Sequence, residues 1–274
     1  MTPYSDAFGR LKNDGALVAF IVVGDPDYET SLEIAKKIVD AGADMLELGL
    51  PFSDPIADGP SIQAADIRAL DNGMDTDKAF KFIEDLRSCT DMPIGILSYY
   101  NLVYQHGIKK FFSDAKNAKI NSVLIADLPI EECNDALKEA KNYGIDSVFM
   151  VSPLTDDLRI KKIAGYATGF IYAVARLGVT GAKAGLEESA SVLVKRIRKF
   201  TDKPICVGFG ISKPEHVRQV IASGSNGAIV GSAIVDLIAN NLKNKEQMLD
   251  NIYSYVKDMK GAAKITKSPH SPNP

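Results

Sequence analysis

Histidine and cysteine are scarce in this sequence, and neither is spaced for metal binding. The three histidines lie outside the expected strands, at His106, His216 and His270. The three cysteines are odd in number and far apart, at Cys89, Cys133 and Cys206. Because metal-assisted chemistry needs clustered histidines and carboxylates, this pattern argues against a catalytic metal. Free thiols in a reducing cytoplasm explain the cysteines best.

The chain also lacks an excess of charge and any long apolar run. Its formal net charge of -3 offers no basic field for nucleic acid. No apolar stretch reaches the roughly 18–20 residues of a membrane span. The N-terminus has no basic region followed by an apolar core, so no signal peptide is expected. We therefore expect a soluble, cytoplasmic protein.

Short apolar runs rich in β-branched residues recur along the chain, each followed by a polar loop and a helical pattern. There are eight such runs, at residues 17–23, 44–50, 92–99, 121–127, 146–151, 168–175, 203–208 and 226–231. Helical patterns between them include residues 28–42, 76–88, 130–144 and 156–167, with room for an extra short helix near 61–72. Apolar strands that alternate with amphipathic helices indicate a parallel sheet covered on its faces.

Eight strand–helix units in a chain of 274 residues predict an α/β fold, specifically a (β/α)8 TIM barrel. A doubly wound open sheet is the competing architecture, and it usually carries the G-x-G-x-x-G fingerprint after its first strand. The corresponding stretch here, VVGDPDYE, lacks that fingerprint. We therefore expect a single barrel domain over residues 1–262. The Pro- and Ser-rich tail, residues 263–274, is expected to be disordered.

The stretch LELGLPFSDPIADGP, residues 46–60, places a carboxylate inside an apolar run. Alternation along the expected strand sets Met45, Glu47 and Gly49 on one face and the leucines on the other. The leucines suit the helix-facing side, so Glu47 is expected to point into the barrel near its mouth, where barrel active sites lie. Asp58 lies in the loop that follows. A buried ion pair would explain Glu47 without a function, and Asp is a common turn residue beside Pro and Gly.

Two glycine-rich turns, VGFGIS and VGSAIVD, follow the seventh and eighth expected strands. In phosphate-binding barrels these loops offer backbone N–H groups, and a short helix after the eighth strand points its positive N-terminus at the anion. Gly208, Gly210 and Gly231 would let the backbone approach a phosphate, and Ser232 would add its hydroxyl while capping the helix. Each glycine taken singly is explained as well by an ordinary turn. Their joint position predicts a phosphate site.

The loop after the sixth expected strand, ARLGVTGAKAGLEES, is long and contains Gly178, Gly181 and Gly185. This composition is typical of a mobile lid that becomes ordered around a ligand. Arg176 and Thr180 are either polar contacts of that lid or ordinary loop surface.

Three familiar ways to break a carbon–carbon bond can be compared with these groups. Schiff-base chemistry needs a lysine near the carboxyl end of a strand, whereas Lys203 begins its strand and no other expected strand carries a lysine. Metal-assisted chemistry lacks its clustered ligands. Proton transfer by carboxylates remains, with the substrate as electron sink, and such help is worth about 10²–10⁴-fold per positioned group.

The motifs together resemble a known family. LELGLPFSDPIADGPSIQ, with FIVVGDP before it and RLGVTG, GFGIS and GSAIV after it, is similar to the tryptophan synthase alpha subunit family over about residues 5–262. That family cleaves indole-3-glycerol phosphate to indole and glyceraldehyde 3-phosphate, a retro-aldol reaction of tryptophan biosynthesis. The resemblance implies the same lyase activity here, with no cofactor in this chain.

The resemblance also implies roles for individual residues. Glu47 matches the catalytic glutamate, which protonates indole C3 and helps remove a proton from the side-chain hydroxyl. Asp58 matches the catalytic aspartate, which holds the ring N–H and stabilises the positive charge that develops on nitrogen. The implied indole pocket includes Phe20, Tyr99, Asp127, Tyr172 and Phe209. The implied phosphate contacts are Gly181, Gly210, Gly231 and Ser232, and Thr180 of the expected lid joins the substrate-binding set.

The same resemblance implies a partner. The family's alpha subunit joins a pyridoxal-phosphate-dependent beta subunit in an α2β2 heterotetramer, where the beta subunit joins indole to serine. The pyridoxal phosphate would belong to the partner, since this chain offers no lysine to hold it. A partner surface that favours closed loops over open ones would raise the activity of this chain.

Three other interpretations stay open at this point. A sugar-phosphate isomerase would need an acid and a base on separate strands, whereas Glu47 and Asp58 come from one strand and its loop. A non-catalytic, partner-binding barrel would not need either carboxylate. A stand-alone lyase that releases indole differs only in its independence from a partner, which is a property of loop equilibria.

Overall fold

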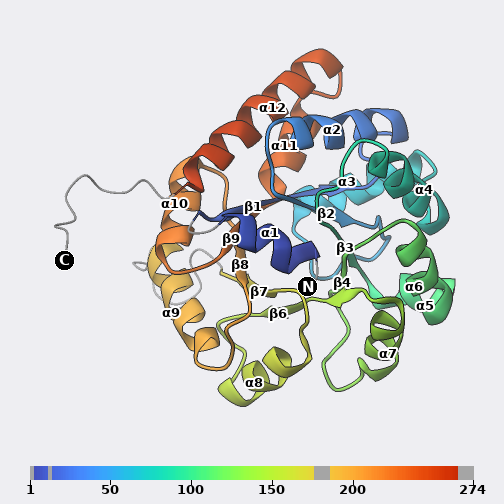
Figure 1. Cartoon of the computed structure of the whole chain (residues 1–274). Helices are drawn as coiled ribbons and strands as arrows, with labels where there is room; N and C mark the ends of the chain where they lie inside the picture. Colours follow the sequence, from blue (N-terminus) through green and yellow to red (C-terminus); the bar gives the residue numbers. More distant parts are fainter. Residues whose placement is uncertain (1–2, 12–13, 176–185, 265–274) are drawn as a thin grey trace.

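The computed structural model describes residues 3–11, 14–175 and 186–264, which form a barrel of parallel strands surrounded by helices (Figure 1). The strands are β1 (Ala16–Val22), β2 (Met45–Gly49), β3 (Ile94–Ser98), β4 (Ser122–Ile125), β5 (Asp146–Ser147), β6 (Phe149–Val151), β7 (Ile171–Val174), β8 (Ile205–Gly208) and β9 (Gly227–Val230). The first six helices are α1 (Pro3–Leu11), α2 (Tyr28–Asp40), α3 (Pro60–Asp71), α4 (Thr76–Arg87), α5 (Tyr100–His106) and α6 (Ile108–Asn117). The others are α7 (Asn134–Tyr143), α8 (Asp157–Tyr166), α9 (Leu186–Arg198), α10 (Pro214–Ala222), α11 (Ser232–Asn240) and α12 (Lys245–Ala262). The predicted TIM barrel is confirmed.

The order of the strands shows how the barrel closes. The sheet runs β5-β4-β3-β2-β1-β9-β8-β7-β6. Its two terminal strands, β5 and β6, are separated in the chain only by Val148, whose N–H donates to the Val123 carbonyl of β4 at 3.1 Å. The predicted fifth strand is therefore two short strands, and the barrel closes where they meet. A doubly wound open sheet is excluded, because its edge strands would lie far apart.

Side chains alternate between the inside of the barrel and the layer beneath the helices. On β2, Met45 belongs to the interior cluster, whereas Leu46 and Leu48 belong to the apolar layer between strands and helices. Glu47 shares the inward face with Met45. The interior cluster also contains Val18, Leu124, Val148, Phe170, Tyr172, Cys206 and Ile229. The predicted pattern of β2 therefore directs the Glu47 carboxylate into a mostly apolar interior.

The amino end of the barrel is closed by α1, which crosses the opening in Figure 1. Its Tyr4 is buried, with its ring centroid 5.5 Å from that of Phe170. The Ser122 hydroxyl donates to the Tyr4 hydroxyl at 2.9 Å, and Gly95 leaves room for it, since a Cβ at Gly95 would lie 2.8 Å from that oxygen. Because this end is filled, a ligand enters from the carboxyl ends of the strands.

The helices correspond to the patterns in the sequence. The four predicted helical ranges contain α2, α4, α7 and α8, and the extra helix predicted near 61–72 is α3. The Asp27 carboxylate caps α2 by accepting from Thr30 N–H at 2.9 Å, and Ile34 and Ile38 bury its apolar face. No helix in the described ranges combines the length and hydropathy needed to span a membrane. Since residues 265–274 lie outside the described residues, the disordered tail stays a prediction.

Candidate active site

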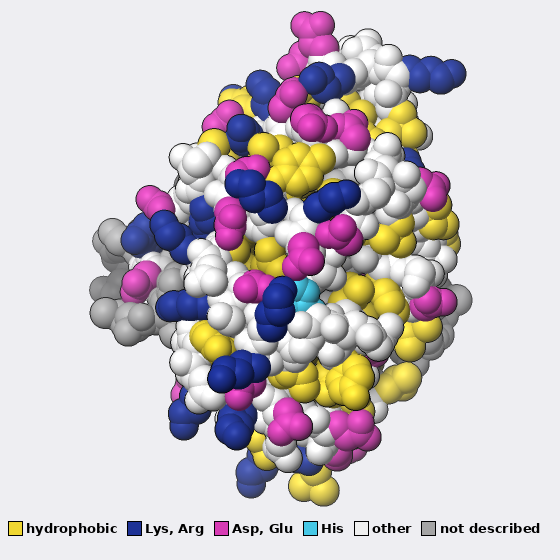
Figure 2. Space-filling view, turned by 90° about the vertical axis from the view of Figure 1, so that its right-hand side faces the viewer, with side chains coloured by type: hydrophobic (Ala, Val, Ile, Leu, Met, Phe, Trp, Pro, Cys, Tyr) yellow, Lys and Arg dark blue, Asp and Glu magenta, His cyan; other side chains and the backbone are white. Residues whose placement is uncertain are grey.

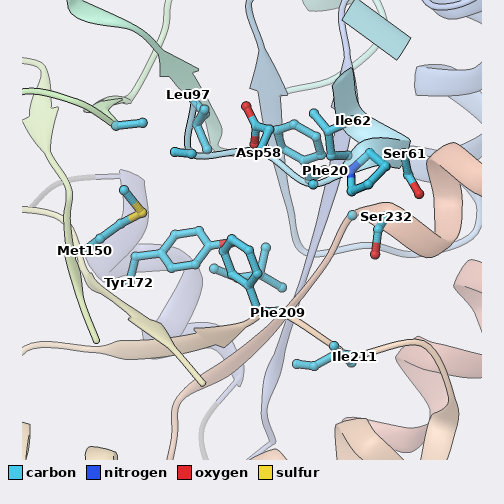
Figure 3. A pocket seen from close by; sticks show the side chains of 17 residues that line it. Phe20, Asp58, Ser61, Ile62, Leu97, Met150, Tyr172, Phe209, Ile211 and Ser232 are labelled. Atoms are coloured by element: carbon cyan, nitrogen blue, oxygen red, sulfur yellow. The ribbon is translucent and has the colours of Figure 1, made fainter. Parts of the chain in front are cut away.

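A cavity of about 330 Å³ lies at the carboxyl ends of the strands (Figure 3). Five strands contribute the apolar side chains of Phe20, Leu97, Met150, Tyr172 and Ile229. The opposite part is more polar, and its lining includes Ser61, Gly210, Gly231 and Ser232. In Figure 3, Leu97 and Met150 lie on one side of the open space, and Ser61 and Ser232 lie on the other. The cavity therefore has one apolar side and one side with hydroxyls and exposed backbone.

Glu47 lies in the barrel interior beside Phe20, its register partner on β1, although it is not itself part of the cavity lining. The residue is 4% exposed, and Oε2 has no hydrogen-bond partner in the described part of the chain. Desolvation, assisted by the negative charge of Asp58, raises the pKa of Glu47 to about 8. Glu47 is therefore mostly protonated at neutral pH and has a proton to give.

Asp58 lines the cavity and is fixed by Tyr99 of the β3–α5 connection. The Tyr99 hydroxyl donates to Asp58 Oδ2 at 2.6 Å and accepts from Ala57 N–H at 3.1 Å. The Tyr99 ring is buried and stacks on Phe52, with 5.0 Å between centroids. Desolvation raises the pKa of Asp58, and the hydrogen bond from Tyr99 opposes that rise. Tyr99 thus positions Asp58 from behind and does not itself line the cavity.

Two helix N-termini meet the polar side of the cavity. The helix predicted after the last strand is α11, which begins at Ser232 with Gly231 as its N-cap residue. Ser61 lies in the first turn of α3. Between β8 and α10, Phe209 and Gly210 both have positive φ, at 77° and 74°. In the described part of the chain no Lys or Arg lines this cavity, so an anion here would be bound by N–H groups, hydroxyls and helix dipoles.

Glycines next to the cavity make room for the aromatic rings. A Cβ at Gly208 would lie 2.5 Å from the Tyr172 hydroxyl. A Cβ at Gly49 or Gly231 would lie 2.7 Å or 3.0 Å from the Phe20 ring. Gly208, which the sequence placed among the phosphate-binding glycines, is absent from the cavity lining. Its steric role is to admit the Tyr172 side chain.

The remaining predicted site residues lie elsewhere. Asp127 is not in the cavity lining: its carboxylate accepts from Tyr100 N–H at 2.7 Å, at the start of α5. Asp127 instead lines a neighbouring cavity of about 300 Å³, together with Arg159. Five predicted lid residues fall outside the described residues, namely Arg176, Gly178, Thr180, Gly181 and Gly185.

Several lining residues were not predicted, although the sequence held a signal for most of them. Leu97 and Met150 pack against the interior cluster and Ile229 belongs to it, so the alternation of their strands would have placed them in the barrel. Ser61 and Ile62 begin the extra helix, and only the direction of α3 brings them to the cavity. That direction is set by packing between elements and not by a local pattern.

One cluster on the outside of the barrel has the composition of a metal site. Asp77 of α4, His106 of α5 and Asp114 of α6 bring potential ligand atoms within 4.8 Å of one another. The Lys110 ammonium lies 2.8 Å from His106 Nε2 and 2.9 Å from Asp114 Oδ2. Figure 2 shows this side of the molecule, where acidic and basic side chains are interspersed. The cluster is therefore a charge-compensated surface network in which a lysine already supplies the cation.

Comparisons with known proteins agree with this geometry. The family model described as tryptophan synthase alpha chain matches residues 8–264. The tryptophan synthase alpha chain of Methanothermobacter thermautotrophicus is 50% identical over 260 residues, which cover 94% of this chain and 96% of the relative. The tryptophan synthase complex from Pyrococcus furiosus contains a chain with 35% identity and a TM-score of 0.81, over 90% of this chain and 98% of that one. The aminoacrylate-bound tryptophan synthase from M. tuberculosis contains another, with 26% identity and a TM-score of 0.86, over 96% and 100%.

Proposed function

Because the chain belongs to the tryptophan synthase alpha chain family, a family of lyases in tryptophan biosynthesis, we propose that Glu47 and Asp58 carry out its cleavage of indole-3-glycerol phosphate to indole and glyceraldehyde 3-phosphate. The observation that supports this assignment is the buried carboxyl of Glu47, which has an unpartnered oxygen beside a cavity lined by Asp58. A buried ion pair, the non-functional explanation of Glu47, is absent among the described residues.

The proposed mechanism needs only these two carboxyl groups. Neutral Glu47 protonates indole C3, and the ring becomes an electron-poor imine that accepts the electrons of the breaking carbon–carbon bond. The Asp58 carboxylate accepts a hydrogen bond from the ring N–H and stabilises the positive charge that develops on nitrogen. The Glu47 carboxylate then takes the proton from the side-chain hydroxyl, which becomes the aldehyde carbonyl. Glu47 gives one proton and receives one, so it returns to its starting state.

The two sides of the cavity suit the two ends of this substrate. Leu97, Met150 and Tyr172 offer an apolar surface for a flat aromatic ring (Figure 3). We place the phosphate at Gly210, Gly231 and Ser232, where the positive end of α11 and free N–H groups favour an anion. The volume of about 330 Å³ lies near the lower end of ligand pockets, which run from about 300 to 1,000 Å³.

The chemistry assigned to this chain uses no cofactor. The family pairs with a beta subunit, and we propose that pyridoxal phosphate belongs to that subunit. Exposed apolar side chains surround the carboxyl end of the barrel, including Ile56 after β2 and Leu154 after β6, at 83% and 90% exposure. We propose this rim as the contact surface for the beta subunit, because these large apolar side chains lie at the same end of the barrel as the loop that carries Asp58.

The decisive experiment compares indole release by the wild type and by Glu47→Gln. Glutamine is nearly isosteric but can neither give nor take the proton, so turnover should fall by several orders of magnitude while the fold is kept. Glu84→Gln, on the exposed face of α4, is the matched control and should keep full activity. Retention by Glu47→Gln of more than about a tenth of wild-type turnover would contradict the proposed role. Isomerisation of an aldose phosphate, with no release of indole from indole-3-glycerol phosphate, would favour the sugar-phosphate isomerase.

A further inference from the structure

A second buried carboxyl group lies close to the site and has no part in the mechanism above. Asp66 of α3 is 4% exposed. The backbone N–H of Phe52, at the start of the β2–α3 connection, donates to its carboxylate. Its other oxygen, Oδ2, is buried without a hydrogen-bond partner among the described residues. One oxygen thus anchors a loop backbone, and the other is left unsatisfied, which is costly for a buried polar atom.

The anchored backbone leads directly to Asp58. The Phe52 ring stacks on the Tyr99 ring, and the Tyr99 hydroxyl donates to Asp58 Oδ2 at 2.6 Å. The same hydroxyl accepts from Ala57 N–H. The β2–α3 connection is therefore held at its start by Asp66 and at its end by Tyr99. Release at Asp66 would disturb both the Phe52–Tyr99 stack and the position of Asp58.

The charges around Asp66 oppose its ionisation. Desolvation and the negative charge of Asp58 raise the pKa of Asp66 to about 7, and Asp25 contributes in the same direction. The hydrogen bond from Phe52 N–H lowers the pKa but is outweighed. Arg68, two residues further along α3, does not neutralise Asp66, because it forms a bidentate pair with Asp25 at 2.7 and 2.9 Å.

The other elements packed against α3 add no compensating charge. Strand β1 has no ionisable side chain, and the one on α11, Asp236, is exposed at the surface. The Tyr99 hydroxyl is uncharged, since burial and its hydrogen bond to Asp58 raise its pKa. Ionised Asp66 is thus a third carboxylate beside Asp58 and Asp25, with a single cation already paired.

We propose that Asp66 is a positioning residue for the reaction, which anchors the β2–α3 connection at Phe52 and leaves Asp58 in place only while it is protonated. The proposal rests on the assignment of Asp58 as a catalytic group. Neutral Asp66 keeps the Phe52 anchor without repelling Asp58. Ionised Asp66 accepts at least as strongly from Phe52 N–H but repels Asp58, so alkaline pH favours an arrangement in which Asp58 is displaced.

The test uses Asp66→Asn and Asp66→Ala, with Asp71→Asn at the exposed end of the same helix as control. Asparagine keeps an acceptor for Phe52 N–H but cannot ionise. In Asp66→Asn we expect kcat/KM for indole release to match the wild type within about twofold at pH 6, because Asp66 of the wild type is then mostly protonated and as neutral as the asparagine. At alkaline pH, the ionisation of Asp66 should start the decline of kcat/KM in the wild type. In Asp66→Asn the decline should therefore begin at higher pH. Asp66→Ala loses the hydrogen-bond acceptor for Phe52 N–H, so its kcat/KM should be about tenfold lower than that of the wild type at every pH, which corresponds to about 1.4 kcal/mol.

A substrate-free measurement separates this proposal from the proposed function. Amide hydrogen exchange of peptides covering residues 52–58 should be faster in Asp66→Ala than in the wild type. At pH 8.5 it should also be faster in the wild type than in Asp66→Asn at the same pH. Identical alkaline limbs of kcat/KM in the wild type and Asp66→Asn would overturn the proposal, as would exchange that the variants leave unchanged. If the wild type released no indole, the proposed function would fail, and the exchange data would still decide whether Asp66 holds the connection.

Discussion

At the scale of single residues, Glu47 shows how a barrel interior prepares an acid. Its neighbours in the interior cluster, among them Met45 and Tyr172, are mostly apolar and offer little to solvate a negative charge. Desolvation raises the pKa of Tyr172 and of Cys206, and the negative charge of an ionised Glu47 would raise both further. These groups stay neutral, so Glu47 gains no charged partner from the interior. The acid form is therefore a consequence of where β2 places the residue.

This burial makes the stability of the fold depend on pH. Between the ordinary value of 4.5 and the folded value of about 8, the folded state holds a proton on Glu47 that the unfolded state has released. The free energy of unfolding therefore falls as pH rises through that interval, and the loss is complete above about pH 8. Gln at position 47 does not titrate. From pH 6 to pH 9, Glu47→Gln should gain about 3 kcal/mol relative to the wild type, since about two pH units of the interval remain above pH 6 and each is worth about 1.36 kcal/mol.

Urea unfolding at pH 6 and pH 9 measures this difference. Glu84→Gln removes an exposed carboxyl group and should show the same pH dependence as the wild type. A wild type and a Glu47→Gln variant with parallel pH dependence would show that Glu47 is ionised in the folded state at pH 6.

The direction of Glu47 could be predicted because strand alternation is a local rule. Its neighbours on β2 follow the same parity, with Met45 inside and Leu46 outside. The rest of the site depends on contacts between distant residues. The hydrogen bond from Tyr99 to Asp58 joins positions 41 residues apart, and no spacing in the sequence predicts it. The role of Gly208 likewise depends on Tyr172, a residue of the adjacent strand.

At the scale of elements, the turn between β8 and α10 combines two unusual conformations. Gly210 has φ of 74°, which glycine adopts freely, and Phe209 before it has φ of 77° despite its large side chain. The strained turn brings both residues to the cavity. The sequence predicted a phosphate-binding turn from its glycines but not the positive φ of Phe209, because local propensity disfavours it.

Gly210→Asp tests the proposed place of the phosphate. The aspartate would set a negative charge beside the site, so binding of glycerol phosphate analogues should weaken at least about tenfold, or 1.4 kcal/mol, while binding of free indole changes little. Gly210→Ala introduces the same backbone strain without the charge and is the matched control. Titration calorimetry with both ligands measures the two affinities. Equal weakening of indole and phosphate ligands in Gly210→Asp would place the phosphate elsewhere.

At the scale of the molecule, one end of the barrel is filled and the other is open. The amino end is filled by α1 and Tyr4, whereas the carboxyl end carries the cavity and the exposed rim residues Ile56 and Leu154. The order of the strand–helix units could be predicted because every unit repeats one pattern. The break of the fifth strand at Val148 could not, since closure of the sheet decides it. A barrel with one open end presents its catalytic loop and its apolar rim to the same partner.

This arrangement leads to the last prediction, in which the beta subunit activates this chain. Asp58 lies on a connection between β2 and α3, not on a strand, so its position depends on a loop that a bound surface stabilises. We expect an isolated monomer with weak indole release that rises at least about tenfold when a cognate beta subunit is added, a coupling of about 1.4 kcal/mol. Leu154→Asp at the rim should abolish that rise and leave the basal rate unchanged. Leu242→Asp, after α11 at the other end of the barrel, should activate normally. Kinetic titration of the three proteins measures the effect, and full activity of the isolated wild type with no response to the partner would identify a stand-alone lyase instead.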